Sequence, residues 1–159
     1  AFLAGDKDVI QFLQYNMRSQ MFAKSLPMPM VKGALKRLDM IRTMPELKDK
    51  LWENTNSLQS GLRAAGFDLG TTKTCITPVY LKDVPEAMAL VHDLRENHGV
   101  FCSIVVYPVI PKGLIILRLI PTTTHTQQDI DETITAFSAI RDLLENGTYK
   151  KIAASMMAE

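Results

Sequence analysis

Two apolar runs joined by a short turn constrain the fold of this chain more than any other feature of its sequence. Residues 100–108 read VFCSIVVYP, residues 113–121 read GLIILRLIP, and the turn VIPKG connects them. Apolar runs of this length, bounded by proline and glycine, are typical of strands. Strands connected by so short a turn pair antiparallel, so the sequence predicts an antiparallel pair here.

Helical periodicity surrounds this pair of strands, and Asp6 can cap the first helix. The spacing of apolar residues predicts helices over about 7–22, 31–42, 44–65, 83–99 and 127–145, and a further strand over 75–81. The expected order is three helices followed by a β-α-β-β-α unit. This order predicts an α/β (α+β) fold in which helices cover a small three-stranded, mainly antiparallel sheet. The residues that follow Gly147 are weakly patterned, and we expect them to fray.

Capping residues mark several of these helix boundaries. Thr43 and Glu46 have the spacing of a capping box, and Asp83 precedes a first turn that contains proline. Thr126 with Asp129 is expected to cap the last predicted helix.

Arg118 is a permanent cation inside the second apolar run. As a strand, this run places Leu114, Ile116, Arg118 and Ile120 on one face and leucine and isoleucine on the other. Because both faces are apolar, we expect the guanidinium to lie close to a core, where a charge is costly unless it is paired. Its partner is either an Asp or Glu of this protein, in a structural ion pair, or an anionic ligand.

Composition excludes several classes of function. A chain of 159 residues suits one domain, and a net charge of +1 gives no electrostatic reason to expect nucleic acid. No apolar stretch approaches the roughly 20 residues that span a bilayer. Cys75 and Cys102 lie in predicted strands, which favours core cysteines of a cytoplasmic protein over a disulfide framework. With three histidines and no cluster at ligand spacing, we expect no metal site.

A few polar residues are weak candidates for a site. His92 and His98 are expected on the solvated face of a helix, and His125 is expected to brace a turn, with a place in a pocket as the alternative. Lys24 and Ser25 lie between two predicted helices, where a hydroxyl near a helix amino terminus favours phosphate.

Four longer segments carry a family resemblance: FLAGDKDVIQFL, MFAKSLPMP, GFDLGTTKTCITPVYL and YPVIPKGLIILRLIPTTTHTQQDID. Together they resemble the carboxy-terminal part of the α-oxoamine synthases, of the class II aminotransferase family. The resemblance implies the aspartate aminotransferase fold (fold type I), a pyridoxal 5'-phosphate cofactor and a homodimer. It implies an acyltransferase that condenses an amino acid with an acyl-CoA and releases CO2.

Within this family the resemblance indicates 8-amino-7-oxononanoate synthase, of biotin synthesis, or a serine palmitoyltransferase-like enzyme, of sphingolipid synthesis. The alternatives are 2-amino-3-ketobutyrate CoA ligase and a non-catalytic regulatory or partner subunit that retains the fold. In such enzymes the Schiff-base lysine lies directly before the stretch that here begins at Ala1. The resemblance therefore implies that this fragment contains no catalytic residue and is inactive alone.

The same resemblance implies a domain division and two kinds of site residue. Residues 1–43 would be the end of the large-domain segment with its connecting helices, 44–149 the small carboxy-terminal domain, and 150–159 a tail. Arg118 matches the arginine that binds the α-carboxylate of the amino-acid substrate. Ser25 or Lys24 would contact the cofactor phosphate of the neighbouring subunit, although Ala23-Lys24 replaces the usual Ser-Thr pair. A second arginine that some members carry is absent from Val106-Tyr107-Pro108.

Overall fold

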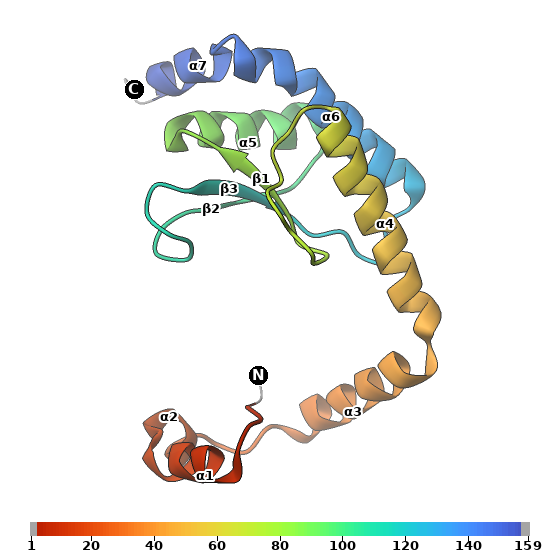
Figure 1. Cartoon of the computed structure of the whole chain (residues 1–159), viewed down its shortest axis with the longest axis vertical. Helices are drawn as coiled ribbons and strands as arrows, with labels where there is room; N and C mark the ends of the chain where they lie inside the picture. Colours follow the sequence, from red (N-terminus) through yellow and green to blue (C-terminus); the bar gives the residue numbers. More distant parts are fainter. Residues whose placement is uncertain (1–2, 157–159) are drawn as a thin grey trace. The chain divides into compact units, whose positions relative to one another are not determined.

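The computed structural model describes residues 3–156, and it divides the chain into two units, residues 1–43 and 44–159 (Figure 1). The first two residues of the predicted amino-terminal segment and residues 157–159 of the predicted tail lie outside the described range.

Over its described residues, 3–43, the first unit contains three helices and no buried residue. They are α1 (Lys7–Asn16), α2 (Arg18–Met21) and α3 (Met28–Thr43). The single helix predicted over 7–22 is wrong, because the backbone of Met17 is extended (φ −85°, ψ 106°) and separates α1 from α2. Asp6 stands at the start of α1, but its side chain makes no capping hydrogen bond. α3 begins earlier than predicted because Pro29 lies in its first turn, where a proline needs no N–H.

The second unit contains the predicted three-stranded sheet. Its strands are β1 (Thr77–Leu81), β2 (Ser103–Val105) and β3 (Ile115–Leu119), in the order β1-β3-β2. Both pairings are antiparallel, which confirms the predicted hairpin and the mainly antiparallel sheet. The last strand in the sequence is therefore the central strand of the sheet. The paired segments of β2 and β3 are shorter than the apolar runs, which continue to Pro108 and Pro121 at their carboxyl ends.

Four helices accompany this sheet: α4 (Pro45–Ala64), α5 (Val84–His98), α6 (Gln127–Glu145) and α7 (Thr148–Met156). The capping box of Thr126 and Asp129 is present as predicted, and Asp83 accepts a hydrogen bond of 2.9 Å from the Glu86 backbone N–H. The capping box predicted at Thr43 is wrong. The Thr43 hydroxyl instead donates to the Asp39 carbonyl within α3, because α4 begins only at Pro45.

The segment after Gly147 is a packed helix, and the expectation that it frays is wrong for its described part. Tyr149 is fully buried and Ala153 is 5% exposed, so one side of α7 joins the core. The Tyr149 hydroxyl also donates to the Asp93 carboxylate on α5. Only two residues of α7 are buried, so the apolar pattern of this segment is too short to predict that it packs on the core.

One face of the sheet forms the core and the other face is open. Val79 and Leu117 are fully buried, and Leu119 is 5% exposed, all on the face that α5 covers. Within this unit the helices lie to one side of the sheet, with α7 packed on α5 and α4 on α6 (Figure 1). The opposite face carries Tyr80 and Arg118, and both are exposed.

Candidate functional site

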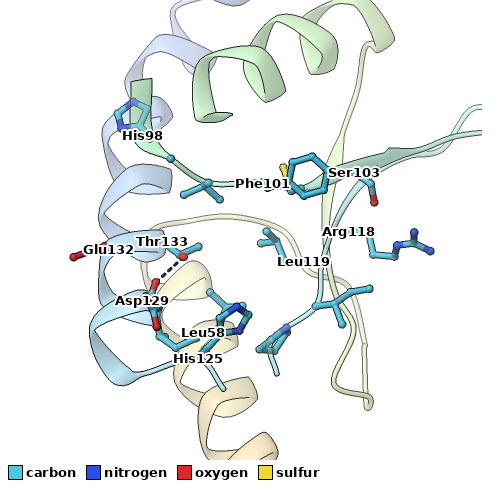
Figure 2. Close-up of a pocket in the computed structure, with 16 residues that line it drawn as sticks. Leu58, His98, Phe101, Ser103, Arg118, Leu119, His125, Asp129, Glu132 and Thr133 are labelled. Atoms are coloured by element: carbon cyan, nitrogen blue, oxygen red, sulfur yellow. Dashed lines mark hydrogen bonds between the residues drawn. The ribbon is translucent and has the colours of Figure 1, made fainter. Parts of the chain in front are cut away.

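A cavity of about 630 Å³ lies at the β2 edge of the second unit, between the start of β2, the end of β3 and the first half of α6 (Figure 2). Its apolar wall includes Phe101, Leu119 and Ile120, and Phe101 is 80% exposed. Arg118 and His125 supply polar groups to the lining. The cavity therefore combines an apolar wall with the cation that the sequence singled out.

Arg118 projects from the open face of the sheet and is exposed to solvent. The expectation that it lies close to a core is wrong in this unit, because Leu114 and Ile120 on the same face are 42% and 50% exposed. Among residues 3–156, the cations of the four ion pairs are instead Lys36, Lys50, Arg95 and Arg141. The structural ion pair thus has no acidic partner in the described part of the chain, and the guanidinium is available to an anion.

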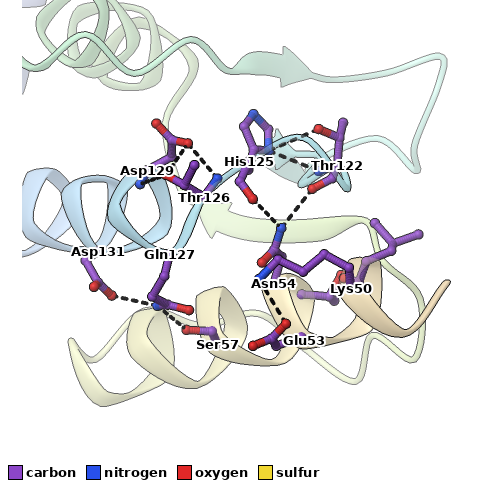
Figure 3. A network of polar contacts seen from close by, with 12 residues as sticks. Lys50, Glu53, Asn54, Ser57, Thr122, His125, Thr126, Gln127, Asp129 and Asp131 are labelled. Atoms are coloured by element: carbon purple, nitrogen blue, oxygen red, sulfur yellow. Dashed lines mark hydrogen bonds and ion pairs between the residues drawn. The ribbon is translucent and has the colours of Figure 1, made fainter. Parts of the chain in front are cut away.

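His125 braces the turn between β3 and α6, as the sequence predicts. Its Nδ1 accepts a hydrogen bond of 3.0 Å from the backbone N–H of Thr122 (Figure 3). An imidazole nitrogen that accepts from an N–H carries no proton, so in the neutral ring the proton is on Nε2. His125 also contributes to the cavity lining, so this residue both braces the turn and lines a pocket.

Asn54 is a structural residue of the site that sequence reasoning missed. Its side chain is fully buried on α4, and its Nδ2 donates to the carbonyls of Thr122 and His125, each at 2.9 Å (Figure 3). Its Oδ1 is buried without a hydrogen-bond partner. These two bonds hold the turn that ends β3 against α4. The signal in the sequence is an amide on the apolar stripe between Leu51 and Leu58.

The remaining polar residues near the cavity are accounted for by local structure. His98 on α5 is exposed, as expected of a solvated helix face, and so is His92. The backbone N–H of Thr126 donates to the Asp129 carboxylate, which lowers the pKa of that carboxyl below its usual value. None of these groups has a partner arrangement that indicates acid–base chemistry.

The two cysteines are both free thiols. Cys102 is 5% exposed and is a core residue as predicted, and its burial raises the pKa of the thiol to about 11. Cys75 is half-buried. The expectation that both cysteines lie within strands is wrong, because Cys75 lies just before β1 and Cys102 just before β2.

Ala23, Lys24 and Ser25 lie in the exposed loop between α2 and α3. They belong to the first unit, whereas Arg118 belongs to the second. The ammonium of Lys24 and the hydroxyl of Ser25 are donors of the kind that bind phosphate, and α3 begins at Met28, after Leu26 and Pro27.

Two features are absent from residues 3–156. No group of three or more His, Cys, Asp or Glu side chains is arranged to hold a metal ion. No helix in that range combines the length and the apolar character needed to cross a membrane.

Comparison with known proteins gives concordant matches. The family profile described as aminotransferase class I and II matches residues 1–137. A cysteate-C-fatty acyltransferase of Capnocytophaga ochracea is 62% identical over all of this chain and 38% of its own length. A serine palmitoyltransferase of Sphingobacterium spiritivorum is 38% identical, over 84% of this chain and 33% of its own.

A solved structure extends the similarity to the fold. Serine palmitoyltransferase from S. paucimobilis, with a pyridoxal phosphate–myriocin aldimine bound, has a TM-score of 0.77 and 28% identity. The match covers 85% of this chain and 34% of that one. The chain therefore spans little more than a third of the length of the proteins that it matches.

Proposed function

Because the chain belongs to the aminotransferase class I and II family, we propose that it forms part of a pyridoxal-phosphate-dependent acyltransferase. The reaction is the condensation of an amino acid with an acyl thioester, with loss of CO2. The observation that carries this proposal is the exposed guanidinium of Arg118 on the open face of the sheet, which has no ion-pair partner among residues 3–156 and lines a cavity of mixed apolar and polar character. An arginine in this state can bind a carboxylate through two parallel hydrogen bonds.

In this proposal Arg118 binds the amino-acid substrate and orients it. Its planar fork fixes both oxygens of the amino acid's α-carboxylate, and so sets the direction of the Cα–carboxylate bond that breaks when CO2 leaves. A lysine would supply the charge but not the plane. Bound pyridoxal phosphate supplies the electron sink for this chemistry.

The donors of the exposed loop fit the cofactor's phosphate. Ser25 and Lys24 are exposed, and a hydroxyl and an ammonium both donate to phosphate oxygens. We assign them to the phosphate of a neighbouring subunit, in a homodimer, on the strength of the family resemblance.

We infer the amino-acid substrate and the acyl donor from the sequence identity to relatives of named activity. At 62% identity over the whole chain, the cysteate-C-fatty acyltransferase is far more similar to this chain than the serine palmitoyltransferase at 38% or the 8-amino-7-oxononanoate synthase of Symbiobacterium thermophilum at 36%. We therefore infer cysteate and a long-chain fatty acyl thioester as substrates. Serine is the second candidate, favoured by the structural match to serine palmitoyltransferase.

The test is an assay of the whole protein with cysteate, serine, alanine and glycine against short and long acyl-CoA. Release of CoA thiol and of CO2 is measured for each pair. We expect the highest kcat/KM for cysteate with a long-chain donor. A preference for alanine or glycine would indicate the oxononanoate synthase or the ketobutyrate ligase, respectively. No release of CoA with any pair would favour the non-catalytic partner subunit.

A further inference from the structure

Ser103 lies directly opposite Arg118 on the neighbouring strand. In the antiparallel pairing of β2 with β3, Ser103 is the register partner of Arg118, two residues from the pair Val105 and Ile116. Side chains of directly opposite residues leave the same face of a sheet, with Cβ atoms roughly 5 Å apart. Figure 2 shows both side chains directed to the same side, away from α6.

Neither side chain has a partner in the described part of the chain. The ion pairs of residues 3–156 do not include Arg118. The Ser103 hydroxyl, which is half-buried, makes no hydrogen bond to any residue in this range, although other hydroxyls near the cavity do, such as that of Thr133 to the Asp129 carbonyl. A free hydroxyl beside a free guanidinium is therefore specific to this position on the sheet.

We propose that the Ser103 hydroxyl donates a hydrogen bond to the same α-carboxylate that Arg118 binds, which makes Ser103 a positioning residue for the amino-acid substrate. This inference rests on the proposed function. A carboxylate accepts about four hydrogen bonds, and a bidentate guanidinium occupies two of them, so each oxygen retains a lone pair. The short serine places its donor near the sheet surface, and the longer arginine reaches beyond it.

The pair has a chemical consequence for the substrate. The guanidinium fixes both oxygens of the carboxylate in one plane. A third donor from the adjacent strand adds a contact from outside that fork, so the carboxylate is held from two strands. Because the α-carboxylate is common to all amino acids, the contribution of Ser103 should be the same for cysteate, serine and alanine.

The test uses the whole protein with its cofactor, titrated with each of these amino acids and followed by cofactor absorbance. Ser103→Ala should weaken the binding of all three by about 10-fold, the lower end of what one hydrogen bond to a charged group contributes. Ser103→Thr retains the hydroxyl and should stay within about 2-fold of the wild type. Ser138→Ala on α6 is the matched control, because that hydroxyl donates only within its own helix.

A double-mutant cycle with Arg118→Lys separates positioning from general damage. If both side chains hold one carboxylate, Ser103→Ala should weaken binding by less than about 2-fold in the Arg118→Lys protein, because the carboxylate is no longer fixed. The full loss in that background, no loss in the wild-type background, or a loss confined to cysteate would each overturn the proposal. If the wild type binds none of the amino acids, the proposed function itself has failed.

Discussion

Asn54 supports the candidate site from outside it, and its replacement should reveal how firmly the end of β3 is held. The buried amide of Asn54 donates to two backbone carbonyls of the Thr122–His125 turn, at 2.9 Å each. We expect Asn54→Ala to lower the free energy of unfolding measurably, and Asn54→Asp to lower it further, because the carboxylate removes both donors and faces the same carbonyls.

The magnitude follows from these contacts. Two hydrogen bonds contribute about 1–3 kcal/mol together. Alanine also removes Oδ1, which is buried without a partner, and the relief of that unsatisfied acceptor offsets about 1 kcal/mol. The net cost of Asn54→Ala is then about 0–2 kcal/mol, centred on about 1 kcal/mol. A buried, unpaired carboxylate costs about 3–5 kcal/mol. Acid should restore part of the stability of Asn54→Asp, since a protonated carboxyl can donate one bond.

Urea unfolding of the 159-residue chain measures these differences, with the fluorescence of Trp52 as the reporter. Trp52 is the single tryptophan of the sequence and lies on the same helix. Asn56→Ala is the matched control, because Asn56 is exposed on α4 and its loss should change stability by less than about 0.5 kcal/mol. If Asn54→Ala and Asn56→Ala shift the midpoint equally, the amide does not hold the turn and the reasoning is refuted.

Four further predictions concern the site, the packing and the surface. Arg118→Ala should leave the melting temperature almost unchanged but weaken amino-acid binding by the whole protein about 10- to 100-fold in a spectral titration; a collapsed melting temperature would instead indicate a core ion pair. Gly61→Ala should lower the free energy of unfolding in urea by about 1–2 kcal/mol, because the new Cβ would lie 2.7 Å from Cγ1 of Ile134. This loss should vanish in an Ile134→Ala background. Burial and the adjacent Asp93 carboxylate raise the pKa of Tyr149, so the stability that this hydroxyl contributes is complete below pH about 10 and is lost as the pH rises above it; melting curves from pH 8 to 11 should show this decline, and Tyr149→Phe should reduce it. The 159-residue chain should self-associate in sedimentation experiments through the exposed apolar side chains of α1 to α3, and a strictly monomeric species at high concentration would contradict this.

Local signals in the sequence predict most of the helices and strands of the second unit. Thr126 and Asp129 define the start of α6 because a capping box depends only on residues three apart. The hairpin of β2 and β3 followed from apolar runs and a short turn. The same local logic was wrong at Thr43, because the spacing of a capping box does not reveal that α3 continues to that residue.

The candidate site was only partly predictable. Arg118 is identifiable from the sequence because a charge within an apolar strand is conspicuous. Its exposure to solvent could not be predicted, because the sequence does not say which face of the sheet the helices cover. Asn54 acts across the fold, on carbonyls far away in the sequence, so no pattern of neighbours indicates it. The predicted hairpin brings Ser103 near Arg118, but the sequence does not fix the register that makes the two residues direct partners. The burial of Tyr149 likewise depends on the contact of α7 with α5.

The position of β3, last in the sequence and central in the sheet, prevents the sheet from assembling in the order in which the ribosome makes it. β1 and α5 emerge before any strand exists to pair with β1. β2 and β3 emerge close together and can pair at once, whereas β1 must join across the whole of α5, which is a longer loop closure. The strand that carries Arg118 is thus the template for the other two, and a chain that stalls before Ile115 has no sheet to complete.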